Sequence, residues 1–254
     1  MRDVFLSVVI PCYDEMANLQ KGVLEKVIGF LKKKHFVFEV IISDDGSKDG
    51  SVEFVESFAK EHSEVVLLKN SHMGKAGAVT AGMLKAKGKY VVFADMDQAT
   101  PIEEIDKLLP FLTDNKADIA IGSRTYNNMG YPFSRLIMHE GMISLRKLIV
   151  GLSQLHDTQC GFKMFTHDAS QKLFKKMYEL HSGFFHISGS AVTAGFDVEL
   201  LLLAEVAGYE IKEVPVHWLY VETRRVNPIK DSVDAVVYLL KIRMNKMQGK
   251  YTIV

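Results

Sequence analysis

The chain has 254 residues, of which 48% are hydrophobic, and its 31 Lys and Arg balance 31 Asp and Glu. This length allows one large α/β domain or two small ones, and the balanced charge provides no global field that would favour nucleic acid. The two cysteines are far apart and in no metal-ligand spacing, so a reducing, cytosolic compartment fits better than a disulfide scaffold.

The N-terminal apolar run ends in the sequence PCYDE, which is typical of a first strand and not of a signal peptide. No uninterrupted apolar stretch approaches the roughly 20 residues that span a bilayer. We therefore expect a protein that is soluble or lies on a membrane surface.

Strands and helices alternate along the first half of the chain. Apolar and β-branched runs predict strands at 5–11, 38–45, 65–70, 89–95 and 117–123. Helical apolar spacing and helix-starting residues predict helices at 15–34, 47–62, 74–87 and 101–112. Apolar runs without alternation are typical of central parallel strands, so we expect an α/β fold with a mostly parallel sheet and helices on both faces. The second half is less regular, although 197–208 reads as a helix.

Polar or charged residues follow each of these strands. In chain order they are PCYDE, DDGS, NSHMGKAGA, DMDQ and GSR. Ligands of such sheets bind at the carboxyl ends of the strands, so we expect these segments to form one site.

Asp95 and Asp97 stand one residue apart at the end of the fourth strand. Their carboxylates would repel each other unless a cation neutralises them. Carboxylate oxygens suit Mg²⁺ or Mn²⁺, and Mg²⁺ is usually held by one or two carboxylates together with substrate phosphates. The alternative is a solvated turn, or Asp97 and Thr100 capping a helix that begins at Pro101.

Asp44 and Asp45 end the second strand, where one helix cap would suffice. The second acid suggests that Asp44 accepts hydrogen bonds from the N–H groups of a nucleobase. Lys75 lies at the start of a helix, where it could meet a phosphate or a base. The chain has neither the P-loop spacing nor a GxGxxG motif after a strand, which disfavours classical NTPase and dinucleotide-binding functions.

Several segments occur in the order found in family 2 glycosyltransferases. They are SVVIPCYDEMANL, IISDDGSKDGS, GKAGAVTAGM, FADMDQAT, GSR, DTQCGFKMF and GFDVELL. The chain especially resembles the dolichyl- or polyprenyl-phosphate sugar transferases, and DTQCGFK with FDVELL is most similar to the dolichyl-phosphate glucosyltransferase branch. The resemblance covers residues 7–218 and leaves 219–254 as a basic, amphipathic extension. It implies a single Rossmann-like GT-A domain over 1–218, a nucleotide-sugar donor, a divalent metal and inversion at the sugar carbon.

Carried over residue by residue, the resemblance also implies a site. The nucleotide sugar would be bound by Pro11, Tyr13, Glu15, Asp44, Asp45, Lys75, Asp95 and Gln159. Catalysis would involve Asp97, Arg124, Asp157, Asp197 and Glu199, although the last two also fit acids in the first turn of a helix. Asp95 and Asp97 would hold the metal, with Gln98 as the candidate third ligand. Related mannosyl transferases tend to carry a metal-binding Gln two residues after the second Asp, whereas that position is Ala99 here and the glutamine is Gln98.

The acceptor side is indicated by apolar and basic residues late in the chain. Residues 133–155 are apolar with scattered basic side chains, and 221–254 carry seven Lys and Arg against three Asp and Glu. An interfacial helix on the cytoplasmic face of a membrane fits this pattern, and a core-packing helix is the alternative. Arg224 and Arg225 could pair with an acceptor phosphate.

We thus expect a metal-dependent, inverting transfer of a hexose from a nucleotide sugar, with UDP-glucose favoured, to a polyprenyl or dolichyl phosphate. Within the same fold, the alternatives are GDP-mannose as donor and a glycan or other hydroxyl as acceptor, which would need a carboxylate base. A nucleotidyltransferase would need a further phosphate-binding loop, which we do not find. A non-catalytic nucleotide-sugar binder would not need intact acids at each strand end.

Overall fold

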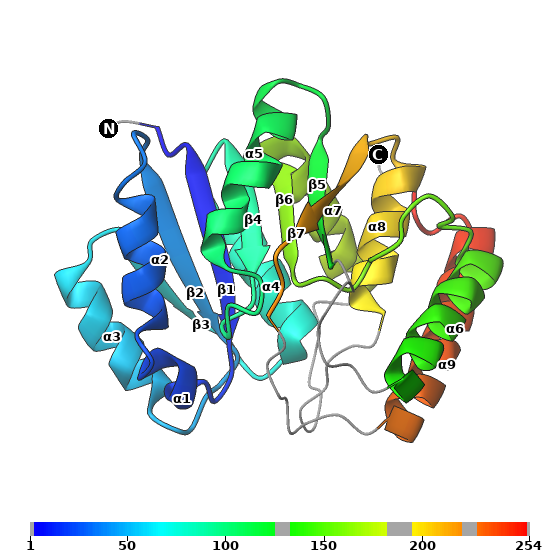
Figure 1. The fold of residues 1–254 in the computed structure, drawn as a ribbon, viewed down its shortest axis with the longest axis horizontal. Helices are drawn as coiled ribbons and strands as arrows, with labels where there is room; N and C mark the ends of the chain where they lie inside the picture. Colours follow the sequence, from blue (N-terminus) through cyan, green and yellow to red (C-terminus); the bar gives the residue numbers. More distant parts are fainter. Residues whose placement is uncertain (1–2, 125–132, 182–194, 220–227, 253–254) are drawn as a thin grey trace.

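One sheet of seven strands organises the part of the chain that the computed structural model describes, residues 3–124, 133–181, 195–219 and 228–252 (Figure 1). The strands are β1 (Leu6–Cys12), β2 (Phe38–Asp44), β3 (Val65–Lys69), β4 (Tyr90–Ala94), β5 (Ile119–Arg124), β6 (Phe162–Thr166) and β7 (Ile211–Val216). Their order is β3-β2-β1-β4-β6-β5-β7. β6 runs antiparallel to both of its neighbours, and the other pairs are parallel.

Helices cover both faces of this sheet (Figure 1). They are α1 (Met16–Leu19), α2 (Val23–Leu31), α3 (Ser51–Glu61), α4 (Gly74–Lys85), α5 (Ile105–Thr113), α6 (Phe133–Val150), α7 (His167–Leu180), α8 (Phe196–Val206) and α9 (Pro228–Met247), with a short 3₁₀ helix over Ile102–Glu104. In the part of the chain that the structure describes, none of the helices combines the length and apolarity needed to cross a membrane.

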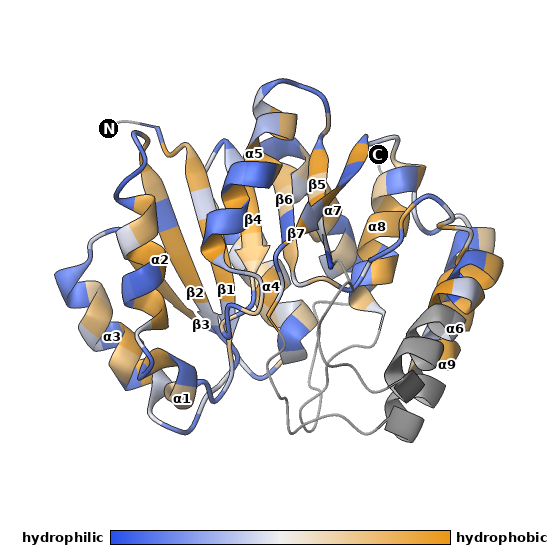
Figure 2. Ribbon diagram, viewed as in Figure 1, coloured by the Kyte–Doolittle hydropathy of each residue, from blue (hydrophilic) through white to orange (hydrophobic). Residues whose placement is uncertain are grey.

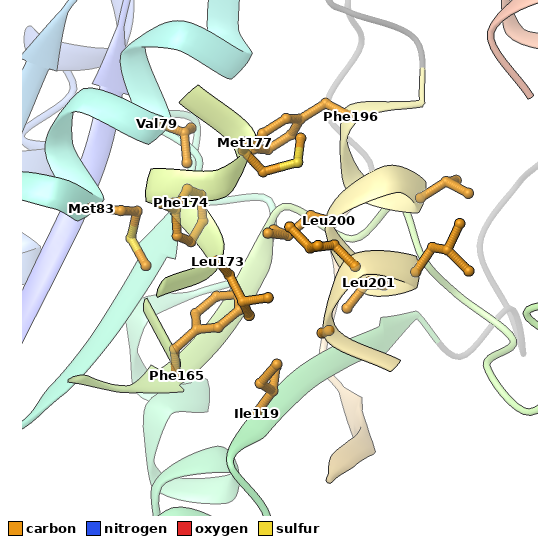
Figure 3. Packing of buried hydrophobic residues seen from close by; sticks show 14 of the residues in the cluster. Val79, Met83, Ile119, Phe165, Leu173, Phe174, Met177, Phe196, Leu200 and Leu201 are labelled. Carbon is orange, nitrogen blue, oxygen red and sulfur yellow. The ribbon is translucent and has the colours of Figure 1, made fainter. Parts of the chain in front are cut away.

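Two hydrophobic cores form, one on each face, because successive side chains of a strand point to opposite sides. In β1, Val8 and Ile10 join α2, α3 and α5 in one core, whereas Val9 joins α4, α7 and α8 in the other. Figure 3 shows this second core, in which Phe165 of β6 and Phe174 of α7 pack with their ring centroids 5.5 Å apart. The strands are correspondingly hydrophobic over most of their length (Figure 2).

All five predicted strands are confirmed, as is the α/β class. Two helices differ from the prediction. The one expected at 15–34 is broken into α1 and α2 by Gly22, whose φ of 75° lies in the left-handed region. The one expected to begin at Pro101 starts with the 3₁₀ turn and becomes α-helical only at Ile105. The strand β6 was not among the predicted strands; it inserts between β4 and β5 from a later part of the chain.

Candidate functional site

The carboxyl ends of the parallel strands meet at one edge of the sheet, as predicted. Cys12 at the end of β1 pairs with Asp44 at the end of β2, which in turn pairs with Lys69 at the end of β3. Because β6 is antiparallel, its first residue lies here too, where Phe162 pairs with Ala94 at the end of β4. The segment before β6 is thereby brought to the same edge.

The carboxylate of Asp44 is buried and only half satisfied. Its Oδ2 accepts hydrogen bonds from the backbone amides of Gly46 (2.9 Å) and Ser47 (3.2 Å). Its Oδ1 is buried and has no hydrogen-bond partner among the residues that the structure describes. A buried acceptor without a donor is costly, so this oxygen is suited to receive an N–H group from a ligand.

Asp45 has a different role, because both of its oxygens are engaged by the segment that leads into α4. Oδ1 accepts from the amide of Met73 at 2.6 Å, and Oδ2 lies 2.9 Å from Nδ1 of His72. Burial raises the pKa of Asp45, although these partners act to lower it. The ring of His72 stacks on Tyr13 at a centroid distance of 4.6 Å. His72, which sequence reasoning missed, therefore joins two of the predicted residues.

Pro11 and Glu15 flank this stack along the chain. Pro11 lies in β1 opposite Ser43 of β2. Glu15 precedes α1, and its Oε2 accepts a hydrogen bond of 2.6 Å from Asn18. Both residues lie at the end of β1 and thus at the polar edge.

Asp95 and Asp97 have distinct surroundings in the turn after β4. Asp95 forms an ion pair of 2.5 Å with Lys75, in the first turn of α4. Asp97 accepts from the amide of Ala99 at 3.0 Å, so it closes the turn and does not cap the following helix. Burial, and then the charge of Asp95, raise the pKa of Asp97. Gln98 donates its side-chain amide to the carbonyl of Asp95 at 2.9 Å.

Few side chains at this turn could act as ligands to a divalent cation. Within the described residues, no three His, Cys, Asp or Glu side chains form a group that could enclose a metal ion. Asp95 and Asp97 supply carboxylates from one turn, and the amide nitrogen of Gln98 is directed back to the backbone. Such a set fits Mg²⁺ or Mn²⁺ when substrate phosphates complete the coordination.

Arg124, the last residue of β5, forms a bidentate ion pair with Asp157. Nε and Nη2 of Arg124 donate to the two carboxylate oxygens at 2.6 and 2.8 Å, and the backbone amide of Arg124 adds a third bond of 3.0 Å. Burial acts to raise the pKa of Asp157, but the hydrogen bonds and charge of Arg124 hold it below its usual range. The same carboxylate accepts from the amide of Gln159 at 3.1 Å. Asp157 thus orders the loop that precedes β6.

The end of that loop reaches two further predicted residues. Gly161 packs directly on Asp95, since a Cβ atom on this glycine would lie 2.1 Å from Asp95 Oδ2. Lys163 is fully buried in β6, and its Nζ donates to the carbonyl of Cys160 at 2.5 Å and to Oδ1 of Asp197 at 2.6 Å. Sequence reasoning missed Lys163, although a lysine within the apolar strand FKMFT was a usable signal.

Glu199 does not accompany Asp197 at this edge, although both lie in the first turn of α8. Its side chain is buried, with Oε2 receiving His181 at 2.7 Å and Tyr238 at 2.5 Å, and Oε1 receiving Tyr251 at 2.6 Å. Burial raises the pKa of Glu199, but these partners lower it to below its usual value. Glu199 therefore connects α8 to α7, α9 and the C-terminal residues.

A small pocket adjoins the loop at Asp157 and Gln159. Three helices contribute to its lining, with Ile143 and Arg146 from α6, Val198 from α8 and Leu239 from α9. The pocket thus links the polar edge of the sheet to the α6–α9 pair. The predicted acceptor residues Arg224 and Arg225 lie outside the described residues.

Comparison with known proteins gives consistent matches. Residues 7–174 match the model of the family described as glycosyl transferase family 2. Relatives named dolichyl-phosphate beta-glucosyltransferase include proteins of Saccharomyces cerevisiae (33% identity over 98% of this chain and 77% of that protein), Drosophila melanogaster (36%, 88% and 69%) and Homo sapiens (30%, 97% and 77%).

Solved structures with the same fold also match. Glucosyl-3-phosphoglycerate synthase from Mycobacterium tuberculosis, in complex with Mn²⁺, UDP and phosphoglyceric acid, aligns with a TM-score of 0.62 at 16% identity, over 99% of this chain and 80% of that one. TarS from S. aureus aligns with a TM-score of 0.54 at 15% identity, over 95% of this chain and 66% of that one. These likenesses show the shared GT-A fold.

Proposed function

The chain belongs to glycosyl transferase family 2, and from this membership we propose that it transfers glucose from UDP-glucose to dolichyl phosphate or a related polyprenyl phosphate. The relatives named dolichyl-phosphate beta-glucosyltransferase support this choice, since they match 88–98% of the chain. The structural observation that carries the proposal is the loop over 157–163. It joins Arg124, Asp95 and Asp197 from three separate elements into one charged site.

On the donor side, Asp44 would bind the nucleobase. Its Oδ1, which has no partner among the described residues, fits the imide N–H of uracil. Tyr13, stacked on His72, offers an aromatic surface at the same edge of the sheet. Guanine also presents N–H donors, so the preference for UDP over GDP rests on the relatives and the resemblance. Pro11 and Glu15 would lie beside the nucleoside, and Asp45 would keep the start of α4 in place.

The diphosphate would lie between Asp95, Asp97 and Lys75. Asp95 and Asp97 would hold Mg²⁺ or Mn²⁺, which when bound supplies positive charge to the leaving diphosphate. Lys75 would exchange part of its interaction with Asp95 for the diphosphate oxygens. The neighbouring carboxylates of Asp95 and Asp197 raise the pKa of Lys75 although desolvation acts to lower it, so this side chain is a cation throughout the neutral range.

The chemistry is an in-line substitution at the anomeric carbon. An oxygen of the acceptor phosphate forms the new bond to that carbon, while the bond to the diphosphate breaks and UDP leaves. Because a phosphate is already anionic, it needs positioning and no general base. Asp157 would be a poor base in any case, since its pKa is lowered. A hydroxyl acceptor would need one, and Asp197 is the better placed candidate.

A lipid phosphate as the acceptor is supported by the relatives named dolichyl-phosphate beta-glucosyltransferase. We also propose that Arg224 and Arg225 contact the acceptor phosphate and that the protein works on the cytoplasmic face of a membrane, which supplies the lipid.

The test is a panel of UDP-glucose, UDP-galactose, GDP-glucose and GDP-mannose with a short, water-soluble polyprenyl phosphate, in Mn²⁺ and in EDTA. We expect product only with UDP-glucose and the metal, and none from an Asp97→Asn variant that unfolds at the wild-type temperature. Preferred use of GDP-mannose would overturn the donor, and transfer to a glycan but not to the lipid phosphate would overturn the acceptor. Undiminished activity of Asp97→Asn would overturn the metal site.

A further inference from the structure

Arg146 of α6 is a buried guanidinium that has no acidic side chain bound to it. The residue is 4% exposed, and within the described residues it forms no salt bridge. Burial lowers its pKa, although the more distant charges of Glu213 and Asp157 act to raise it. A buried charge without a bound counter-charge is costly, so its hydrogen bonds have to account for its position.

The hydrogen bonds of the Arg146 side chain go to the loop that precedes β6. Nη1 donates to the hydroxyl oxygen of Thr158 at 2.6 Å. Nη2 donates to the carbonyl oxygen of Leu155 and to that of His156, the latter at 3.3 Å. A guanidinium presents its N–H groups as a planar fork and can therefore reach all of these acceptors at once.

Glu213 of β7 holds the same loop through its backbone amides. Its Oε2 accepts from the amide of His156 at 2.9 Å, and its Oε1 accepts from the amide of Asp157 at 2.7 Å. Burial acts to raise the pKa of Glu213, but these two amides hold it below its usual range. A cation thus binds the acceptors of the loop and an anion binds its donors. We call Arg146 and Glu213 the loop clamp.

The residue that the loop clamp encloses is Asp157. The clamp binds the chain at 155 and 156 before it, at the amide of Asp157 itself, and at 158 after it. The carboxylate of Asp157 in turn accepts two bonds from the guanidinium of Arg124. Arg124 belongs to β5, so the direction of its side chain depends on where the loop places Asp157. A misplacement of about 1 Å in a positioning group can lower a rate by about 100-fold.

We infer that Arg146 and Glu213 are positioning residues for the transfer reaction. They fix the loop so that Asp157 presents the guanidinium of Arg124 to the phosphate groups of the substrates. This role rests on the proposed function, in which a cation at Arg124 stabilises the charge on those phosphates. Three strands separate β2, which carries Asp44, from β5, so the loop clamp should not affect binding of the nucleobase.

The first test compares Arg146→Met and Glu213→Gln with the wild type, using UDP-glucose, Mn²⁺ and the water-soluble polyprenyl phosphate. We expect kcat to fall by about tenfold or more in Arg146→Met, and by less in Glu213→Gln, because the glutamine amide keeps one acceptor oxygen. UDP affinity in calorimetry should stay within about twofold of the wild type, because the nucleobase site is intact. Thermal unfolding checks that both variants keep the fold.

The matched control is Arg243→Met in α9. Arg243 also donates to backbone carbonyls, those of Leu148 and Ile149 in α6, but it is exposed and does not bind the loop. Its kcat should equal that of the wild type. Wild-type kcat in both clamp variants, or a loss in Arg243→Met as large as that in Arg146→Met, would overturn the inference.

A double variant tests whether the loop clamp acts through Arg124. If it does, Arg146→Met should cost much less in an Arg124→Gln background than in the wild type, because the group that it positions is already gone. The same fold-loss of kcat in both backgrounds would show that Arg146 acts independently of Arg124 and would overturn the inference.

Hydrogen exchange of the segment 154–162 tests the loop clamp without any substrate. Exchange should be faster in Arg146→Met than in the wild type and unchanged in Arg243→Met, and equal exchange in all three would overturn the clamp. Kinetics separate the two proposals. Another preferred donor or acceptor, with the same loss of kcat in the clamp variants, would overturn the proposed function alone. Transfer from UDP-glucose that the clamp variants retain would overturn the inference alone, and absence of any wild-type transfer would overturn both.

Discussion

Gly161 offers the sharpest test of the site, because a single added methyl group would strike Asp95. In Gly161→Ala the new Cβ would lie 2.1 Å from Asp95 Oδ2, so this carboxylate has to retreat by about 1.3 Å to reach the 3.4 Å of ordinary contact. A misplacement of about 1 Å in a positioning group can lower a rate by about 100-fold. We therefore expect kcat/KM for glucose transfer to fall by about that factor.

The fold should survive this change. Gly161 has no left-handed φ, so alanine fits its backbone, and local overpacking costs typically about 1–3 kcal/mol. The control is Gly29→Ala in α2, where a Cβ meets nothing within 4 Å and where alanine should stabilise the helix by about 0.5–1 kcal/mol. Its kinetics should equal those of the wild type.

Three measurements decide the matter, namely steady-state kinetics, calorimetric titration of Mn²⁺ in the presence of UDP, and thermal unfolding. Weaker Mn²⁺ binding together with a small loss of stability would place the defect at Asp95. If Gly161→Ala keeps both wild-type kcat/KM and wild-type Mn²⁺ affinity, the position of Asp95 does not matter and the site as argued is wrong.

Three further predictions concern separate residues. Asp44→Asn should weaken UDP binding by about tenfold or more in calorimetry, because the unpaired oxygen is lost or turned into a donor, and unchanged affinity would remove Asp44 from the base site. Since burial and then Asp95 raise the pKa of Asp97, protonation should begin at a higher pH than for an ordinary aspartate. Mn²⁺ affinity should therefore fall on acidification earlier than a normal carboxylate predicts, and a fall only in the usual aspartate range would contradict this. Tyr251→Phe removes a 2.6 Å bond to Glu199 and should lower the free energy of unfolding by about 1–2 kcal/mol in urea, with Tyr178→Phe as an exposed control that changes little.

Glu199 also has a predictable effect on stability against pH. Its folded pKa is depressed, so its contribution to stability is present above the unfolded pKa of a glutamate and is lost as the pH falls through the lower folded value. In Tyr251→Phe one of the groups that lower this pKa is missing. Acid unfolding of that variant should therefore begin at a higher pH than in the wild type, as circular dichroism would measure.

The strands and the polar edge were predictable because their signals are local. Five apolar runs of strand length alternate with helical segments, and the rule for parallel sheets then places Asp44, Asp95 and Arg124 at one edge. The family resemblance added Asp157 and Asp197. The apolar runs and the family motifs show which strand or helix a residue belongs to and whether it lies at the end of that element.

The contacts among these residues were not predictable, because they depend on where distant segments meet. β6 enters between β4 and β5 against the direction of both, and only this insertion brings Gly161 onto Asp95. The separation of Asp197 from Glu199 has the same origin. Both lie in the first turn of α8, but Lys163 of β6 meets the first, whereas residues near the C-terminus enclose the second.

The ion pairs explain how an edge with so many acids can receive a diphosphate. Asp95 is paired with Lys75, Asp157 with Arg124 and Asp197 with Lys163, so each of these carboxylates is neutralised within the protein. Asp97 forms no salt bridge with any described residue.

The negative charge of Asp97 is not neutralised by a salt bridge, and its pKa is raised because desolvation and the charge of Asp95 both disfavour the ionised form. A divalent cation between Asp97 and the substrate phosphates would remove the imbalance and bring the donor to the edge at the same time. Two acids one residue apart then differ in their surroundings: Asp95 is held in place by Lys75 and Gly161, and Asp97 has no such ion pair among the described residues, but both carboxylates would hold the cation. Lys75 and Lys21 act to lower the pKa of Asp97, but neither lysine forms a salt bridge with it in the described part of the chain, so this carboxylate remains available to the metal.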